Sequence, residues 1–276
     1  MISFSAVFVN LAQVGPTVAG FYRMLFGGII LLAAALIRRE RLWQGFNHFL
    51  QVFACSILFA LDLAFWHRSI YYVGPGLATL LANFQVFFLA GFGILILGER
   101  PTWKTALSTP LAVAGLYLVV GIDWGELGIQ YKTGILFGLI AAICYSAYLL
   151  VLRRLRPAHK RASTLANITL ITLLTAGIMG PGAWAQGEGF GIPDLRSWGA
   201  LLGYGLIPQV LGWFFISAGI AKIDASRAGL LLLLQPTLAF VWDILFFARP
   251  TGLMEMLGAL VALFSIYLGT ISPKRQ

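Results

Sequence analysis

Long hydrophobic runs dominate the chain, and short stretches rich in glycine, proline and charge separate them. Each run is continuously apolar, which favours helices over the alternating strands of a membrane barrel. Nine runs fall within the roughly 17–25 residues that a membrane-crossing helix uses. The pattern predicts an all-α integral membrane protein with ten transmembrane helices, at residues 2–14, 16–37, 49–73, 77–97, 106–122, 133–152, 163–185, 198–221, 228–248 and 253–271.

The first run is the short one. Residues 2–14 precede Gly15 and Pro16 and would form roughly 20 Å of helix, against a hydrocarbon core of about 30 Å. We therefore expect a truncated first helix, which either begins upstream or crosses incompletely. A signal peptide is the alternative, but no basic segment precedes the apolar run.

Composition excludes a soluble globule. Hydrophobic residues make up 59% of the 276 residues and charged residues 11%, against roughly 45–50% and 25% in soluble domains. The net charge of +9 comes from basic residues clustered between the apolar runs, so we predict no nucleic-acid partner and interpret the clusters as topology signals. Cys55 and Cys144 lie inside apolar runs and indicate no disulfide framework.

The distribution of Lys and Arg predicts the orientation. With a cytoplasmic N-terminus, 14 of the 19 basic residues fall in inner connections and 3 in outer ones, while Arg23 and Arg68 lie inside helices. Cytoplasmic loops carry an excess of Lys and Arg. We therefore predict a multi-pass protein with both termini in the cytoplasm.

The two halves of the chain share a pattern. Residues 73–102 correspond to residues 223–251, because Gln85 matches Gln235, 150 positions later, and both stretches end in Arg-Pro-Thr. Chance similarity between Leu-rich helices is the alternative. Five helices per copy is an odd number, so the second copy must be inverted. We predict two inverted repeats, residues 1–122 and 131–271.

Three stretches resemble a known family. They are Phe21-Tyr22-Arg23-Met24-Leu25-Phe26, the turn Tyr72-Val73-Gly74-Pro75-Gly76-Leu77-Ala78, and Leu97-Gly98-Glu99-Arg100-Pro101-Thr102. With them the chain resembles the drug/metabolite transporter superfamily, in its bacterial ten-helix EamA-type branch. Two departures are the missing aromatic-Gly opening of the first helix and Ala248-Arg249-Pro250 where the family often keeps Gly-Glu.

The resemblance implies a permease of the bacterial cytoplasmic (inner) membrane that transports small metabolites. It implies a central cavity surrounded by helices 1, 3, 4, 6, 8 and 9, with helices 5 and 10 as a peripheral pair. It also favours export of amino acids or related metabolites.

Asp62 is the clearest candidate for a transport residue. Trp66 and Ser69 follow it at i+4 and i+7, so one helix face offers a carboxylate, an aromatic ring and a hydroxyl. A charge at membrane depth is costly and normally faces the bundle interior. Asp62 could carry a proton or bind a substrate ammonium; an ion pair with Arg23 or His67 is the alternative. We expect Arg23 and His67 near the outer membrane surface.

Further polar candidates lie in the fourth and eighth helices. Thr79 and Asn83 share one face, whereas Gln85 points about 200° away, so we expect only Asn83 to line the cavity and Gln85 to bond to a neighbouring helix. Gln209 and Trp213 also share a face, beside a proline that removes a backbone donor. With Gln235 and an aromatic pair, the predicted substrate-binding set is Asp62, Trp66, Thr79, Asn83, Tyr145, Tyr148, Gln209, Trp213 and Gln235.

Missing motifs narrow the class. The sequence has no Walker-type loop and no cluster of metal ligands, so we predict neither an ATP-driven pump nor a cofactor or metal. A membrane-embedded enzyme would need convergent acid, base or nucleophile groups, and a non-transporting scaffold is the other alternative. Glycine spacings such as Gly134-x3-Gly138 allow close helix packing, within the chain or in a homodimer. The sequence predicts a secondary transporter that works by alternating access on a small-molecule substrate, with proton coupling through Asp62 as a hypothesis.

Overall fold

A computed structural model describes residues 2–85, 87–88, 103–120, 128–155, 163–213, 215, 238, 242, 244–246 and 252–270. Regular structure in these ranges is helical throughout. The elements are η1 (Ile2–Phe4), α1 (Ser5–Leu11), α2 (Pro16–Ile37), α3 (Phe46–Val73), α4 (Pro75–Ala82), α6 (Trp103–Val120), α7 (Ile129–Arg154), α8 (Thr164–Ala185), α9 (Leu195–Tyr204), the π-helical turn η2 (Gly205–Gly212) and α13 (Leu253–Thr270). The predicted helix at residues 228–248 lies outside the described residues.

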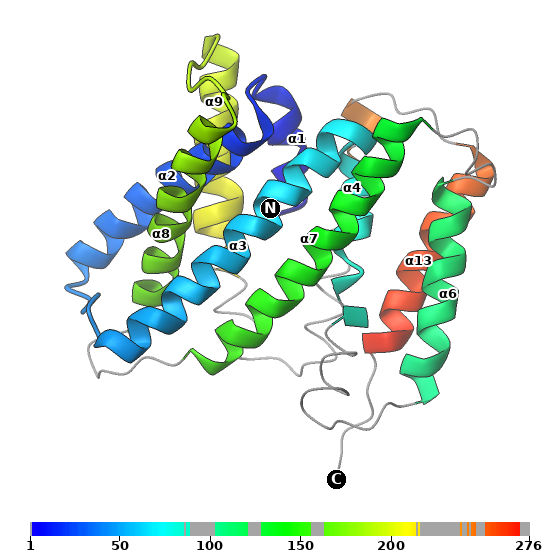
Figure 1. The fold of residues 1–276 in the computed structure, drawn as a ribbon, viewed down its shortest axis with the longest axis horizontal. Helices are drawn as coiled ribbons and strands as arrows, with labels where there is room; N and C mark the ends of the chain where they lie inside the picture. The colour runs from blue at the N-terminus through cyan, green and yellow to red at the C-terminus, as the bar shows by residue number, and fades with distance from the viewer. Residues whose placement is uncertain are drawn as a thin grey trace.

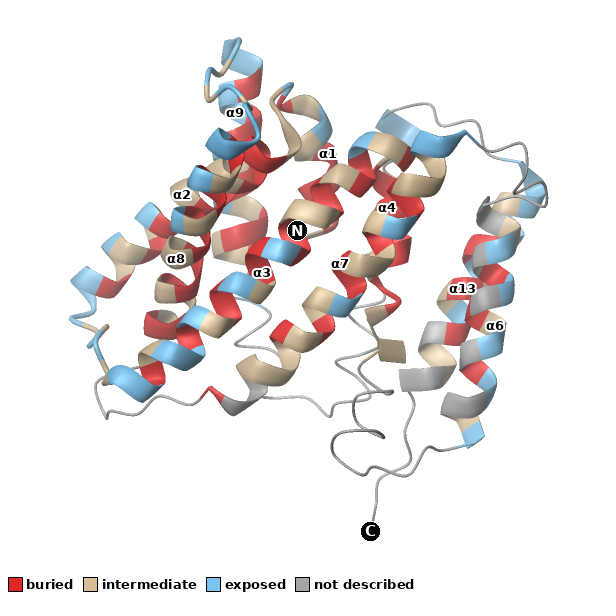
Figure 2. Cartoon of the chain, viewed as in Figure 1, coloured by how far each residue is buried: buried red, intermediate tan, exposed pale blue. Residues whose placement is uncertain are grey.

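Four helices are long and apolar enough to cross a membrane: α2, α3, α7 and α8. Large apolar side chains also cover their outward surfaces, with Ile29, Leu61 and Leu136 among the exposed ones. Figure 2 shows buried residues on the faces that neighbouring helices turn toward one another and exposed residues on the outward faces. An apolar exterior of this kind fits a lipid solvent rather than water.

Local sequence explains where the helices begin. Pro16 is the first residue of α2, a position where its missing N–H costs nothing and its fixed φ suits the helix. Gly74 separates α3 from α4 with a φ of 83°, a conformation that glycine adopts freely, and Pro75 then begins α4. The chain therefore turns sharply after α3, and α4 packs back against it.

Close helix packing depends on glycine. A Cβ at Gly134 would lie 2.5 Å from Cβ of Tyr72, and one at Gly138 would lie 2.7 Å from Cβ of Leu81. The predicted glycine spacing thus packs α7 against α3 and α4 within the chain. Gly115 makes a similarly close approach, because its Cβ would lie 2.5 Å from the backbone nitrogen of Ala262. It joins α6 to α13, which Figure 1 shows as a pair at one end of the molecule.

Helices α2 and α8 pack along their lengths, and each receives a cap from the segment that follows the other. The backbone N–H groups of Thr17 and Val18 each donate to Glu188 Oε2 over 3.0 Å. At the opposite end, the backbone N–H and hydroxyl of Ser163 donate to the carboxylate of Glu40 over 2.8 and 2.7 Å. Glu40 and Glu188 each lie three residues past the end of their helix. These carboxylates satisfy orphan N–H groups at the positive ends of the helix dipoles.

Candidate functional site

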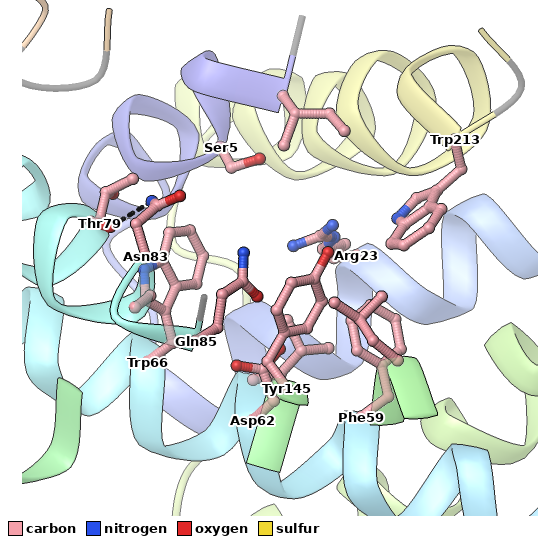
Figure 3. Close-up of a pocket in the computed structure, with 14 residues that line it drawn as sticks. Ser5, Arg23, Phe59, Asp62, Trp66, Thr79, Asn83, Gln85, Tyr145 and Trp213 are labelled. Carbon is pink, nitrogen blue, oxygen red and sulfur yellow. Dashed lines mark hydrogen bonds between the residues drawn. The ribbon is translucent and has the colours of Figure 1, made fainter. Parts of the chain in front are cut away.

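A cavity of about 150 Å³ lies between the helices. Space of this size accommodates about one benzene-sized molecule. Its walls come from the N-terminal segment, α2, α3, the end of α4, α7 and the residue after η2 (Figure 3). The lining residues are Ile2, Ser5, Arg23, Phe59, Asp62, Leu63, Trp66, Thr79, Ala82, Asn83, Gln85, Tyr145, Leu149 and Trp213.

Six residues of the predicted set border this cavity. On α3, Asp62 and Trp66 stand one turn apart, as their spacing predicts. Ser69, a turn further on, is separate: its hydroxyl donates to the carbonyl of Gly134 over 2.8 Å and joins α3 to α7. The six residues are Asp62, Trp66, Thr79, Asn83, Tyr145 and Trp213.

The carboxylate of Asp62 is buried and borders the cavity. Its side chain is 7% exposed, and within the described ranges it forms neither a hydrogen bond nor an ion pair. The alternative pairing with Arg23 or His67 is absent there, because both of those side chains bond elsewhere. A buried charge without a partner is costly. Asp62 is therefore suited to hold a proton or a cationic group of a ligand.

Arg23 belongs to a buried hydrogen-bond network that joins α2 to the second half of the chain. Its Nε donates to Oε1 of Gln209 and its Nη1 to Oη of Tyr204, each over 3.0 Å. The guanidinium carbon also lies 4.8 Å from the centre of the Tyr204 ring. Gln209 in turn donates to the hydroxyl of Thr172 over 3.0 Å. Arg23 is 5% exposed, so its side chain does not snorkel to water, whereas its position near the outer membrane surface stays a prediction.

His67 extends the network, and its position near the outer membrane surface likewise stays a prediction. It is fully buried, with its Nε2 3.0 Å from Oη of Tyr204 and its Nδ1 bonded to the carbonyl of Leu63. Since a carbonyl only accepts, Nδ1 carries a proton, and a neutral ring accepts from Tyr204 at Nε2. Tyr204 of α9 contacts α3 here. The apolar pattern of α3 could not reveal this contact, because α9 lies far from α3 in the sequence.

The π-helical turn η2 separates two residues that we expected on one face. Pro208 lies inside it, and the irregular helix agrees with the backbone donor that this proline removes. Gln209 bonds to Arg23 and does not line the cavity, whereas Trp213 lines it. Indole Nε1 of Trp213 is buried and has no partner among the residues described.

Asn83 and Gln85 both border the cavity, although we expected only one of them to do so. Helix α4 ends at Ala82 and a turn follows, so the angular offset of a continuous helix does not apply. The side-chain amide of Asn83 donates to the carbonyl of Thr79 over 2.7 Å. Oε1 of Gln85, expected to bond to a neighbouring helix, is buried and unpartnered in the described part of the chain, while its backbone carbonyl accepts from Ser146.

Aromatic rings form one wall of the cavity. The ring of Phe59 stacks on Tyr148 with centroids 4.8 Å apart, and Trp213 meets both rings edge-on, at 6.1 and 6.3 Å. Tyr148 was predicted to line the cavity, but it is not among the lining residues. It packs against the lining residue Tyr145, with the two ring centroids 5.8 Å apart. Gln235 lies outside the described residues.

Sequence reasoning missed Ser5, Arg23, Phe59 and Gln85 as lining residues. Ser5 lies in the short first run, and Phe59 lies one turn before Leu63 on the Asp62 side of α3. No group of three or more His, Cys, Asp or Glu side chains that could hold a metal occurs in the described ranges.

The sequence matches the model of the EamA-like transporter family over residues 1–121 and 132–271. An uncharacterised transporter of Bacillus subtilis, YwfM, is 24% identical over 95% of this chain and 86% of its own length. The pseudopaline exporter CntI of Pseudomonas aeruginosa is 26% identical over 77% of this chain and 72% of its own. A solved crystal structure shares the fold, with a TM-score of 0.71 and 19% identity over 98% of this chain and 93% of that one. The family match confirms the resemblance seen in the sequence.

Proposed function

The chain belongs to the EamA-like transporter family and is a multi-pass membrane protein, and on this premise we propose that it is a secondary transporter that exports small metabolites, such as amino acids, by alternating access. The observation that carries the proposal is the cavity bordered by the buried Asp62, which has no partner among the described residues. A structural core would satisfy such a group, whereas a binding site leaves it for a ligand. In the proposal, Asp62, Trp66, Thr79, Asn83, Tyr145 and Trp213 contact the substrate.

Helix contacts support two inverted repeats as the basis of alternating access. The first half contributes α1, α2, α3, α4 and α6, and the second contributes α7, α8, α9 with η2, a segment outside the described residues, and α13. The packed pairs α2–α8 and α6–α13 each join equivalent helices of the two halves. Exchanging the halves also converts the α1–α9 pair into the α3–α7 pair. A pseudo-two-fold axis that relates residues 1–122 to residues 131–271 would produce these packed pairs.

Direction and coupling are further parts of the proposal. Export is favoured by the name of the relative CntI, a pseudopaline exporter. The distribution of Lys and Arg favours both termini in the cytoplasm of a bacterial inner membrane. Proton coupling is assigned to Asp62. A buried carboxylate that exchanges a proton for a substrate group would link proton movement to substrate movement across the membrane.

Reconstitution into liposomes tests the proposal. The purified protein is reconstituted into liposomes that are loaded with unlabelled amino acids. Uptake of labelled amino acid by counterflow is then measured with and without an imposed pH gradient. We expect flux above protein-free liposomes that responds to the gradient, and loss of both in Asp62→Asn. Asp194→Asn is the matched control, because Asp194 lies at the start of α9, away from the cavity, and asparagine also caps helices well. Absence of flux for amino acids, amines, purines and sugars alike would contradict transport, and product formation without flux would favour the enzyme alternative.

A further inference from the structure

Helices α2 and α8 end in the same way. After α2 the backbone N–H of Glu40 donates to the carbonyl five residues earlier over 2.9 Å, and Arg39 has a φ of 52°. After α8 the backbone N–H of Glu188 donates to the carbonyl five residues earlier over 3.0 Å, and Gly187 has a φ of 70°. Both ends are Schellman motifs, in which a residue with left-handed backbone closes the helix. Each residue of the first motif corresponds to the residue 148 positions later in the second.

The last residue of each motif is a glutamate that reaches the start of the other helix. Each carboxylate accepts hydrogen bonds of 2.7–3.3 Å from the residues that begin that helix. The receiving ends correspond as well, because Pro16 and Thr164 are the first residues of α2 and α8 and are also 148 positions apart. The two helices lie side by side (Figure 1), so equivalent contacts join them at both ends. We name these contacts the Glu40 clasp and the Glu188 clasp.

Neighbouring contacts strengthen both clasps. At one end, the hydroxyl of Tyr22 on α2 donates to the carbonyl of Phe190, in the segment after α8, over 2.6 Å. At the other end, the side-chain amide of Gln44 donates to Oδ1 of Asn167, in the first turn of α8, over 3.2 Å. A carboxylate at the positive end of a helix dipole also forms stronger hydrogen bonds than a neutral acceptor does. Sliding or tilting of α2 against α8 would break these contacts.

The two clasps are closed at the same time in one structure. In the proposed alternating access, inverted halves exchange their conformations when the cavity changes the side to which it opens. That exchange would convert the Glu40 clasp into the Glu188 clasp and the Glu188 clasp into the Glu40 clasp. Because both are closed before the exchange, both are closed after it.

We propose that α2 and α8, locked by the two clasps, form a rigid unit that keeps its geometry through the transport cycle while the other helices move against it. The inference rests on the proposed alternating access and narrows its mechanism. Two halves that share a locked helix pair cannot move past each other as whole bodies, so the movement belongs to the helices outside the pair.

Covalent bridges at both clasps test this inference. Glu188→Cys with Gly15→Cys, and Glu40→Cys with Ser163→Cys, replace each carboxylate contact by two thiols. A Cβ at Gly15 would lie 3.0 Å from Cγ of Glu188. The hydroxyl of Ser163 lies 2.7 Å from the carboxylate of Glu40. A short, reducible cross-linker that reacts with thiols therefore spans either pair.

Counterflow in liposomes is measured with both bridges closed and again after reduction, with Cys55→Ala and Cys144→Ala in the background. We expect the two values to agree within about twofold, because a rigid unit does not need to open. A loss of more than about tenfold that reduction reverses would overturn the rigid unit and leave the transport function standing. Absence of flux in the reduced protein and in the wild type alike would overturn the proposed function, and this inference with it. Ser163→Cys alone, treated with the same cross-linker, controls for the reagent.

A distance measurement covers the case in which the cysteine substitutions at the clasps prevent folding. Spin labels at Ile37→Cys and Trp184→Cys, in the same background, leave both clasps intact. The two positions are 83% and 77% exposed and lie at opposite ends of the helix pair. Pulsed electron spin resonance should give one distance that is the same at two pH values and with or without amino acid. Two distances in one sample, or a shift between conditions, would overturn the rigid unit.

Discussion

Two polar regions of the interior differ in how their hydrogen-bonding groups are satisfied. In the network around Arg23, the side chains of Gln209, Tyr204 and His67 all have hydrogen-bond partners. Around the cavity, Asp62 has no partner in the described part of the chain, and neither do single atoms of Ser5, Gln85 and Trp213. The first region meets the cost of burial within the protein. In the proposed function a ligand meets that cost in the second region, so substitutions in the two regions should affect different properties.

The largest effect on transport is expected from Asp62→Asn. The amide keeps the shape but removes the charge that would bind a proton or an ammonium, so counterflow should fall by about 100-fold or more. The melting temperature should be unchanged or higher, because an amide is less costly to bury than an unpaired carboxylate. A large loss of stability with preserved transport would place Asp62 in the structural region instead.

The opposite outcome is expected for Gln209→Leu. It leaves the N–H of Arg23 and the hydroxyl of Thr172 without partners, so unfolding should become easier by about 1–3 kcal/mol. Transport by the protein that remains folded should fall less than tenfold. Thermal unfolding and counterflow on the same preparation separate the two effects, and an unchanged melting temperature would contradict a structural role for the network.

Trp213→Phe should produce a smaller and purely functional change. The ring remains against Phe59 and Tyr148, while the unpartnered indole N–H is lost. We expect affinity for the transported solute to fall by up to about tenfold, with no loss of stability. Trp184→Phe is the control, because Trp184 is 77% exposed at the end of α8. Equal effects of the two substitutions would exclude a ligand contact at Trp213.

Removing a charged cap should have a modest effect on stability and little on transport. Glu188→Gln keeps an acceptor near Thr17 and Val18 but removes the charge at the start of α2, which should cost about 0.3–1 kcal/mol. Glu40→Gln should do the same at the start of α8. Thermal unfolding of the single and double variants measures both, and near-additive losses are expected because the caps lie at opposite ends of the helix pair.

The smallest effect is expected at Asp194. Its carboxylate accepts a hydrogen bond and therefore offers a comparison with Asp62. The backbone N–H of Ser197 donates to it over 2.7 Å and lowers the pKa of the Asp194 carboxyl below its usual value. A lowered pKa stabilises the fold above the ordinary aspartate pKa, and this contribution is lost as the pH falls through the lowered value. Acidification should therefore loosen the start of α9 slightly in the wild type but not in Asp194→Asn, as measured by amide exchange.

Much of the fold followed from the apolar runs, because the bilayer imposes a helix length that sequence can reveal. Helical spacing also placed Asp62 beside Trp66, and Thr79 near Asn83, correctly on the cavity. Errors arose where spacing no longer applies. Gln85 follows the end of α4, where an ideal helix no longer places the side chain, and Gln209 is held by its hydrogen bond to Arg23 of α2.

Arg23 and His67 could not be placed from their own helices. Each looked like a basic residue near a helix end, whereas in the structure both bond to Tyr204 of α9, which begins more than a hundred residues later. A single apolar pattern gives the face of a helix but not the partner that covers it. The network around Arg23 was therefore visible only in the folded chain.

The order of synthesis determines when the caps on α2 and α8 can form. Glu40 is made 123 residues before Ser163, so the start of α8 finds its cap already present. Thr17 is made 171 residues before Glu188. At roughly 5–20 residues per second, a ribosome needs about 10–35 s to cover that distance. The first N–H groups of α2 therefore stay without this cap until the second half of the chain has been made, and the nascent N-terminal half cannot complete its own helix start.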